Sequence, residues 1–237
     1  MKISKYILGA ALFAGLFFPQ AEAEAQDVKL KCMEWNIKSL EYRGNSNVSK
    51  DISRFVTEIE NQQADIVCFN EFETLTGAMY MKEKATEFAK ALGMYAGADQ
   101  RSAGWADILV PTDANPTGVK VRIVCTHLDA FGGDETCYEQ AKEVIAKAIE
   151  PAVAEGTPVI LMGDMNCGPG TAAIAEYEKT GTRLCNNNGT FGGSKLDYFI
   201  GFPQGSWSCP DFRVLDSSTF YDLSDHYSIS GTAVLNR

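Results

Sequence analysis

Short apolar runs alternate with helical apolar stripes along most of the chain, and this alternation predicts an α/β protein. Apolar runs bounded by turn residues are typical of strands, and apolar positions spaced by three and four are typical of amphipathic helices. Strands are predicted at residues 28–36, 64–70, 104–110, 119–128, 158–163, 196–200 and 227–235, and helices at 47–62, 81–92, 138–148 and 171–180. The pattern, with a turn-rich PTDANPTG hairpin in the middle, indicates two packed sheets covered on the outside by helices.

Residues 158–168, PVILMGDMNCG, stand out because an apolar run leads directly into polar side chains. Asp164 and Asn166 follow at positions i and i+2, so continued strand geometry would carry both out of the core on the same side. A strand that delivers catalytic groups to its end explains this pattern. A strand that ends in an Asx turn explains it equally well. Other strand ends must decide between the two interpretations.

Polar residues also gather at the ends of the other predicted strands. The chain has two histidines, and each stands at a strand end with an aspartate close by. One histidine in such a place is more often structural, but two of two favour a functional site. The residues of this kind are Asn36, Glu71, His127, Asp129, Asp164, Asn166, Asp197, Asp225 and His226.

These residue types fit hydrolysis of a phosphate ester with the help of a divalent cation. Glu71 and Asp164, together with amide oxygens, are ligands that suit Mg²⁺. His226 can take a proton from water if an aspartate such as Asp197 holds its other ring nitrogen. His127 can stabilise negative charge on the phosphoryl oxygens or assist the leaving group. No GxSxG motif is present, so a covalent serine mechanism is not indicated.

The net charge of −10 bears on which substrates the protein can attract. An acidic surface does not attract polyanions or anionic lipids over long range, which argues against a basic-groove nucleic-acid binder. It does not exclude an enzyme that meets phosphate locally through a cation. No protein partner is predicted.

The first residues resemble a signal peptide. Lys2 and Lys5 precede an apolar stretch over 6–18 that is short for a membrane span, and Ala23-Glu24-Ala25 is a typical cleavage site. We therefore expect residues 1–25 to be removed, leaving one domain over 26–237 without a transmembrane segment in a secreted or periplasmic protein. The alternative is an uncleaved N-terminal anchor.

Seven cysteines allow disulfides in an exported protein, although an odd number leaves at least one thiol free. Cys32, Cys68 and Cys125 lie inside apolar runs and are interpreted as buried small hydrophobic residues. The other four lie in or beside predicted loops: Cys137, Cys167, Cys185 and Cys209. The pairing cannot be deduced from the sequence.

Six short motifs occur in an order that resembles the endonuclease/exonuclease/phosphatase superfamily, the deoxyribonuclease I-like proteins. They are MEWNI, DIVCFNE, CTHLD, LMGDMN, KLDYFIG and LSDHYSI, and they extend from about residue 28 to 236. The resemblance implies a four-layer α/β/β/α sandwich of two mainly antiparallel sheets packed face to face, with helices outside. The site is then expected at one edge of the two sheets.

The resemblance also implies a role for each polar residue in these motifs. Metal binding would fall to Glu71, with Asn36 beside it and Asp225 assisting with metal or phosphate. Catalysis would fall to His226 as base, Asp197 as the residue that orients it, Asp164 and Asn166 as the residues that orient water and phosphate, and His127 as a phosphate contact. Arg101 lies in a segment similar to the family's phosphate-binding arginine segment, although a surface arginine is an equal alternative. The expected cofactor is Mg²⁺ or Mn²⁺.

The chain departs from the family pattern in its middle. Asn70 replaces the glutamine that many members carry before the glutamate, and a GNAILS-type segment is missing between the second helix and Arg101. One sheet is therefore expected to be short or to have an exposed edge. The loop over 201–216 is expected to shape the substrate pocket, with Trp207 and Phe212 either touching substrate or packing on their own loop.

The leading hypothesis is a secreted, metal-dependent phosphodiesterase of the nuclease type, acting by in-line attack of water. Its substrate could be a nucleic acid or a phospholipid headgroup. Alternatives are a phosphomonoesterase, a sphingomyelinase-like enzyme or an inositol-phosphate phosphatase. A shortened, inactive member that serves as a binding protein is a further alternative from a different functional class.

Overall fold

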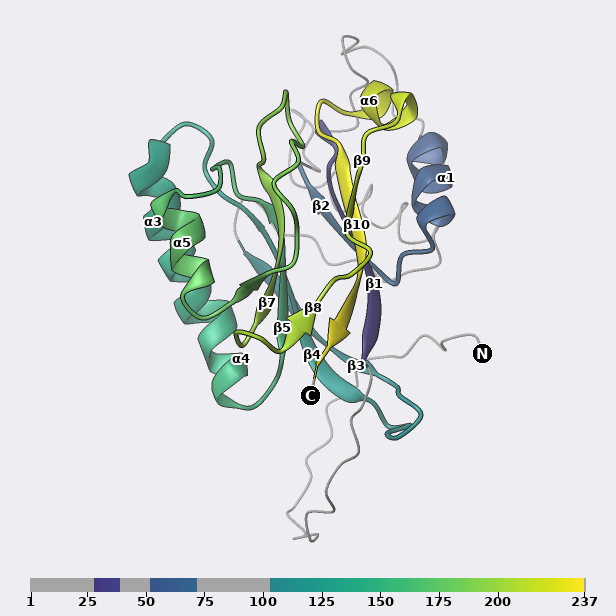
Figure 1. The fold of residues 1–237 in the computed structure, drawn as a ribbon, viewed down its shortest axis with the longest axis vertical. Coiled ribbons are helices and arrows are strands. Elements are labelled where there is room, and N and C mark those ends of the chain that lie inside the picture. The colour runs from purple at the N-terminus through teal and green to yellow at the C-terminus, as the bar shows by residue number, and fades with distance from the viewer. Residues whose placement is uncertain (1–27, 39–51, 72–102, 237) are drawn as a thin grey trace, which may run out of the picture.

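Two β-sheets pack face to face between two layers of helices in the computed structural model, which describes residues 28–38, 52–71 and 103–236 (Figure 1). The helices at the left of Figure 1 cover one sheet, and those at the right cover the other. This arrangement confirms the predicted four-layer α/β/β/α sandwich. It also confirms that each sheet is mainly antiparallel, since each contains one parallel pair among the described strands.

The first sheet is built around the N-terminal and C-terminal strands of the described chain. Its order is β2 (Ile66–Asn70), β1 (Lys29–Asn36), β10 (Ser228–Leu235) and β8 (Trp207–Ser208), with β9 (Arg213–Leu215) also paired to β10. β1 and β2 run parallel, and β10 runs antiparallel to β1. β2 therefore has one sheet neighbour among the described strands.

The second sheet is centred on the strand that contains Asp164. Its order is β3 (Gly104–Val110), β4 (Val119–His127), β5 (Val159–Asp164), β7 (Asp197–Phe202) and β6 (Thr182–Arg183). β5 is parallel to β4 and antiparallel to β7. Within the described residues β3 is an edge strand, and its Trp105 and Leu109 side chains are exposed.

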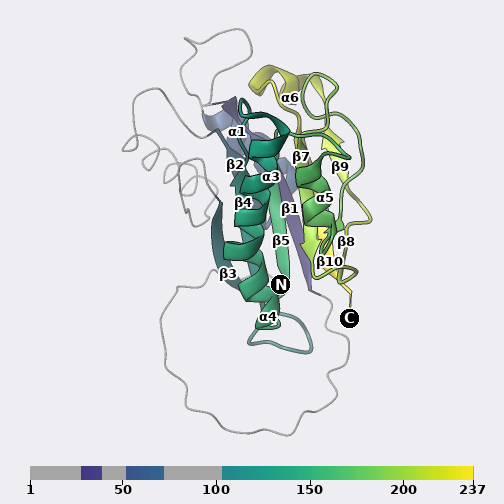
Figure 2. The same ribbon diagram turned by 90° about the vertical axis from the view of Figure 1, so that its left-hand side faces the viewer.

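Helices cover the outer face of each sheet (Figure 2). On the second sheet, α3 (Gly133–Val144) continues through a π-helical stretch, η2 (Ile145–Ile149), into α4 (Glu150–Ala154), and α5 (Ala172–Glu178) packs beside α3. On the first sheet lie α1 (Ile52–Gln62) and α6 (Ser218–Leu223). None of the helices in the described part of the chain has the length and apolar content to span a membrane.

The side chains of β1 point alternately toward the helices and toward the other sheet. Met33, Trp35 and Ile37 join the apolar cluster beneath α1 and α6. Cys32 faces the other sheet within the apolar cluster between the sheets. Because successive side chains point to opposite faces, Glu34 and Asn36 lie on the same face as Cys32 and are directed between the two sheets.

Most predicted strands are confirmed, and several short elements were not predicted. The central strands agree with the prediction to within about two residues, which is the usual uncertainty of element ends. The sequence patterns did not indicate β6, β8, β9 or α6, which are two to six residues long. The signal peptide (1–25), the helix at 81–92, Arg101 and the segment expected to lack a strand lie outside the described residues.

Of the two alternatives expected for Trp207, substrate contact is wrong, and the side chain packs into the core rather than only on its own loop. Trp207 starts β8, is 2% exposed and packs in the apolar core between the sheets. Its indole N–H donates a hydrogen bond to the carbonyl oxygen of Phe202. Phe212 also packs against this core, so the aromatic side chains of 201–216 stabilise the sandwich.

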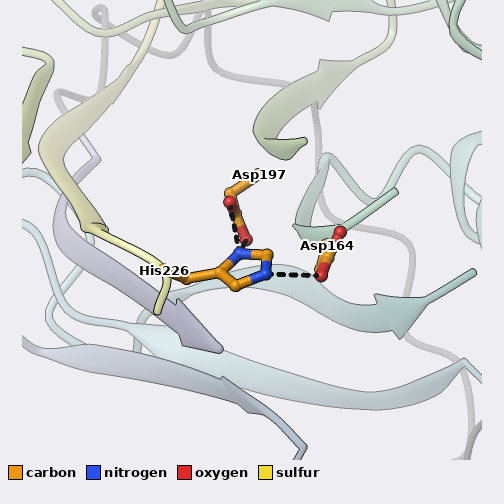
Figure 3. A group of neighbouring side chains, drawn as sticks. All are labelled: Asp164, Asp197 and His226. Atoms are coloured by element: carbon orange, nitrogen blue, oxygen red, sulfur yellow. Dashed lines mark hydrogen bonds and ion pairs between the residues drawn. The ribbon is translucent and has the colours of Figure 1, made fainter. Parts of the chain in front are cut away.

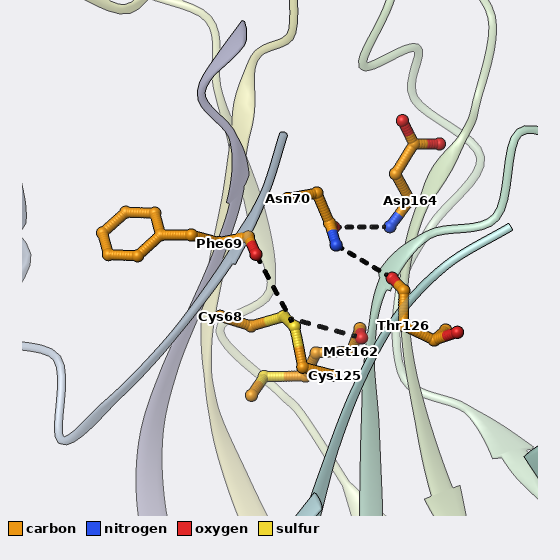
Figure 4. The surroundings of a disulfide bond; sticks show 7 residues. All are labelled: Cys68, Phe69, Asn70, Cys125, Thr126, Met162 and Asp164. Atoms are coloured by element: carbon orange, nitrogen blue, oxygen red, sulfur yellow. Dashed lines mark hydrogen bonds between the residues drawn. A yellow bond between two sulfur atoms is a disulfide. The ribbon is translucent and has the colours of Figure 1, made fainter. Parts of the chain in front are cut away.

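The interpretation of Cys68 and Cys125 as simple core residues is also corrected. They form a disulfide between β2 and β4, with Cα atoms 5.9 Å apart (Figure 4). The other five cysteines are free thiols, and Cys32 is buried as expected. The two cysteines lie on neighbouring strands of different sheets, and the local sequence does not show which strands become neighbours.

Candidate active site

The strand register of the second sheet places three predicted site residues in one row. His127 is the last residue of β4, Asp164 the last of β5, and Asp197 the first of β7. His127 pairs with Asp164, and Asp164 pairs with Asp197. Since β7 runs antiparallel, its beginning meets the ends of β4 and β5 at the same edge of the sheet.

The first sheet supplies the opposing residues of the site. Asn36 ends β1 and pairs with Asn70, which ends β2. Glu71 follows Asn70 directly, and His226 stands two residues before β10. The polar residues of both sheets therefore meet at one end of the sandwich.

His226 lies between two carboxylates (Figure 3). Its Nδ1 is 3.0 Å from Oδ2 of Asp197, and its Nε2 is 3.7 Å from Oδ2 of Asp164. Because a carboxylate accepts hydrogen bonds, Nδ1 donates to Asp197. This contact orients the ring so that Nε2 faces Asp164.

Asp164 is held by hydrogen bonds from several segments. Its Oδ2 accepts from Nδ2 of Asn36 at 3.0 Å, and its Oδ1 accepts from the backbone N–H of Asn166 at 2.9 Å. Nε2 of His127 lies 3.6 Å from the same Oδ2. Asp164 is 1% exposed, so these contacts leave its carboxylate a single orientation at the centre of the site.

The buried carboxylates shift one another's ionisation. Burial and the charge of Asp197 raise the pKa of Asp164 to about 7. Burial opposes protonation of His226, but the hydrogen bond that its ring donates to Asp197 and the charges of Asp197 and Asp164 outweigh it and raise the pKa of His226 to about 9. A positive group bound beside the Asp164 and Asp197 carboxylates would oppose both shifts.

A third buried acid, Glu34, was not predicted. Its side chain lies between the sheets on the same face of β1 as Asn36 and is fully buried. Burial and the charges of Asp197 and Asp164 raise its pKa well above the usual range. A charged residue at an inward position of an alternating strand was the signal that could have revealed it.

Glu71 leaves β2 in an unusual backbone conformation. Its φ is +49°, in the left-handed region that non-glycine residues seldom adopt. Asn70, immediately before it, donates from Nδ2 to the carbonyl oxygen of Thr126 at 3.0 Å and accepts the backbone N–H of Asp164 at 2.9 Å. The side-chain amide of Asn70, which differs from the glutamine of many family members, therefore links the end of β2 to β4 and β5.

Asp225 and Asn166 make contacts that their predicted roles did not include. Oδ2 of Asp225 forms an ion pair with Nζ of Lys38 at 2.9 Å. The backbone N–H of Lys38 also donates to Oδ1 of Asn36. Asn166 donates from Nδ2 to the carbonyl oxygen of Leu128 at 2.9 Å. Lys38 is thus a cationic residue of the site that sequence reasoning missed.

Three further residues support His226 and Asp197. Ser224 accepts the backbone N–H of His226 and donates to the carbonyl oxygen of Asn36. Thr190 accepts the backbone N–H of Asp197. The ring of Phe191 packs against the His226 ring, with centroids 4.7 Å apart. These residues lie in loops whose sequence carries no periodic signal, so only tertiary contacts reveal them.

The residues present fit a divalent cation. The ligand atoms of Asp164, Asp197 and His226 lie within 4.8 Å of one another. Crowded, buried carboxylate oxygens are the donors that hard cations prefer. The raised pKa of Asp164 is the physical sign that positive charge would stabilise this group. Arg101, the predicted phosphate ligand, lies outside the described residues.

Solved structures share this fold at low sequence identity. A Bacteroides vulgatus endonuclease/exonuclease/phosphatase has a TM-score of 0.65 and 16% identity, covering 88% of this chain and 99% of its own. Bacteroides thetaiotaomicron mannosyl-6-phosphatase has a TM-score of 0.58 and 15% identity, covering 87% and 100%. D. rerio TDP2 complexed with a single-strand DNA product has a TM-score of 0.54 and 16% identity, covering 86% and 98%.

A comparison with family models gives the more specific result. No curated protein matches the chain significantly. The model of the Endonuclease/Exonuclease/phosphatase family, however, matches residues 33–226. This range begins in β1 and ends at His226, so it includes every strand that contributes to the site. The chain belongs to the endonuclease/exonuclease/phosphatase family.

Proposed function

We propose that this protein is a metal-dependent phosphoesterase that hydrolyses a phosphodiester by in-line attack of water. The observation that carries the proposal is the position of His226 between Asp197 and Asp164, with contacts of 3.0 and 3.7 Å. Family membership supports hydrolysis of a phosphate ester as the reaction class. The intact arrangement of these buried groups favours an enzyme over an inactive binding protein.

His226 acts as the general base in this proposal. Asp197 holds Nδ1 and stabilises the imidazolium that forms when Nε2 takes a proton from water. Asp164 and Asn166 orient the water and the phosphate. His127, which is close to the same oxygen of Asp164, stabilises charge on the phosphoryl oxygens.

Glu71 and Asn36 would hold Mg²⁺ or Mn²⁺ beside Asp164, with Asp225 assisting. A divalent cation supplies positive charge that polarises the phosphoryl oxygen and steadies the leaving oxygen. Positive charge near Asp164 also lowers the pKa of His226 toward neutrality, which leaves Nε2 free to accept a proton. Arg101 is proposed as an additional phosphate contact.

The substrate is proposed to be a small or locally recognised diester. The net charge of −10 disfavours long-range attraction of polyanions. One structural neighbour is named as a mannosyl-6-phosphatase and another holds a DNA product. Both a monoester and a nucleic acid therefore belong in any test, and a phospholipid headgroup belongs beside them.

We also propose that the protein is exported after removal of residues 1–25. The disulfide between Cys68 and Cys125 supports this, because structural disulfides persist mainly in oxidising compartments. N-terminal sequencing of protein from the periplasm or medium should find Gln26 first. Recovery of the full chain only from cytoplasm would contradict export.

The activity can be tested with bis(p-nitrophenyl) phosphate, plasmid DNA, sphingomyelin, inositol phosphates and sugar phosphates. We expect turnover of at least one diester with Mg²⁺ or Mn²⁺, and loss of turnover with EDTA or in His226→Ala. Faster turnover of a monoester than of any diester would assign a phosphomonoesterase instead. Absence of metal-dependent turnover on the whole panel would refute the enzyme proposal.

A further inference from the structure

The Cys68–Cys125 disulfide is the one covalent link between the two sheets in the described part of the chain. Cys68 is in β2 of the first sheet, and Cys125 is in β4 of the second (Figure 4). The sulfur atoms lie close to the carbonyl oxygens of Met162 and Phe69, at 3.7 and 3.8 Å. The bond therefore sits between the sheets, against the strands that lead to the site.

In each of its two strands, the disulfide cysteine lies two residues before a residue of the site. Cys68 and Asn70 are two residues apart in β2, so their side chains point to the same face, toward the second sheet. Cys125 and His127 have the same spacing in β4. Asn70 contacts Thr126 and Asp164 at 3.0 and 2.9 Å, directly beyond the disulfide.

β2 depends on these links because of its place in the sheet. Its backbone pairs with β1 alone among the described strands. Val67 and Phe69, on its other face, pack in the cluster beneath α1 and keep the strand in the first sheet. Loss of the disulfide would therefore leave β2 in its sheet while freeing its end to move relative to β4 and β5.

We propose that Cys68–Cys125 is a positioning disulfide that sets Asn70 and Glu71 relative to His127 and Asp164, a role that rests on the proposed metal-dependent activity. Glu71 is the proposed principal metal carboxylate, and it follows the last residue of β2. Displacement of a catalytic group by about 1 Å can cost about a hundredfold in rate. Cation binding and turnover therefore depend on the oxidised form.

Reduction is a two-electron step. A phosphine reductant breaks the S–S bond and is itself oxidised to the phosphine oxide with an oxygen atom from water, and each sulfur takes up a proton to become a thiol. Oxidised glutathione restores the link by thiol–disulfide exchange, in which its own S–S bond breaks and two molecules of reduced glutathione take up the two electrons and two protons. The oxidation state of this one bond therefore determines whether the end of β2 is covalently held to β4.

The test compares two double variants of the full chain. Cys68→Ala/Cys125→Ala removes the link, and Cys137→Ala/Cys167→Ala removes two buried free thiols that pack beneath the helices of the second sheet. We expect the first to lower kcat about tenfold to a hundredfold with little change in KM, and to weaken Mn²⁺ binding, measured by calorimetry, about tenfold. The second should stay within about twofold of the wild type on both measures.

Phosphine treatment of the wild type provides a second measurement that does not depend on a substitution. We expect reversible loss of Mn²⁺ affinity with an unchanged far-UV circular dichroism spectrum. Retained Mn²⁺ affinity in both the reduced protein and the Cys68→Ala/Cys125→Ala variant would overturn the proposal. Loss of fold along with affinity would also overturn it, in favour of a purely stabilising bond. Oxidised wild type that binds Mn²⁺ but turns over no substrate would refute the proposed function while the binding comparison still tests the disulfide.

Discussion

An acidic residue stands at the end of β5 and another directly after β2, Asp164 and Glu71, but the two strand ends are held in place by different means. β5 has neighbours on both sides, and its Asp164 is fully enclosed by strands and loops. Among the described strands β2 is an edge strand, and Glu71, which follows it, is only half-buried. The central strand obtains its position from sheet pairing, whereas the edge strand obtains it from Asn70 and a disulfide that reach across to the other sheet.

The difference shows how a sandwich can build a site at its end. Backbone pairing fixes residues within one sheet to a fraction of an ångström, but it does not fix one sheet relative to another. Polar side chains and a covalent bond supply that second constraint here. Variants at the two strand ends should therefore differ in their effect. Those at the end of β5 should remove groups that act in the reaction, and those at the end of β2 should displace groups that remain present.

The largest effect is expected from His226→Ala, which removes the proposed base. General acid–base catalysis contributes about 10²- to 10⁴-fold, so we expect kcat to fall about a thousandfold with the fold retained. His127→Ala, at the end of the neighbouring strand, should cost less, on the order of tenfold to a hundredfold. Equal losses in the two variants, measured by steady-state kinetics, would remove the distinction between their roles.

Gly163→Ala should destabilise the β5 end strongly. A Cβ atom at Gly163 would lie 1.9 Å from the carbonyl oxygen of Thr126, and backbone on the neighbouring strand cannot easily move. Overpacking of this kind costs about 1–3 kcal/mol or more in the free energy of unfolding. Gly168→Ala, with no atom within 4 Å of its Cβ, is the matched control in urea unfolding. Similar stability of the two variants would show that the pairing of β4 and β5 is looser than described.

Asn70→Ala tests the hydrogen-bonded part of the β2 anchor. It leaves the buried N–H of Asp164 and the carbonyl of Thr126 without their partner. An unsatisfied buried group costs about 1–3 kcal/mol, so we expect a loss of about 2 kcal/mol in chemical denaturation. The exposed Asn187→Ala should change stability by less than about 0.5 kcal/mol. An Asn70→Ala protein as stable as the control would show that these hydrogen bonds do not hold β2 against the second sheet.

The pH dependence of stability, measured without a divalent cation, tests the ionisation of Asp164 and His226. The pKa of Asp164 is raised from 3.8 to about 7, and that of His226 from 6.5 to about 9. A raised pKa in the folded state contributes stability that is present below the unfolded pKa and is lost as the pH rises through the folded value. We therefore expect these groups to lower the unfolding free energy in EDTA between about pH 4 and pH 9.

Asp197→Asn is the control for this pH dependence. It removes the charge that helps raise both pKa values, so the decline should become shallower. With two histidines in the chain, NMR can follow His226 directly, and its titration midpoint should fall in the variant. An unchanged midpoint would show that Asp197 does not control the ionisation of His226.

The smallest effect on stability is expected from Lys38→Ala. The ion pair with Asp225 is partly exposed, and such pairs contribute about 0–1 kcal/mol. Thermal unfolding should therefore change little. If Lys38 also contacts the phosphate of the substrate, the KM of the Lys38→Ala variant should rise by a larger factor than its kcat falls. A stability loss above about 2 kcal/mol would instead make Lys38 part of the structural frame.

Sequence patterns predicted the fold and the residues at the strand ends because both have local signatures. Alternating and continuous apolar runs report burial, which is how β1, β5 and β10 were found. The motifs around Glu71, Asp164 and His226 carried a family resemblance that the family model supports. Short elements such as β8 were missed, since two residues contain no measurable period.

Apolar and polar patterns in the sequence were sufficient to locate the long strands, their apolar faces and the polar residues at their ends. The three-dimensional structure was needed to show that His127, Asp164 and Asp197 share one row, that Glu34 is buried and that Trp207 belongs to the core. It also decided that Cys68 pairs with Cys125. These outcomes depend on register and on the packing of one sheet against another. Such contacts join residues far apart in the chain, and no local pattern of side chains encodes them.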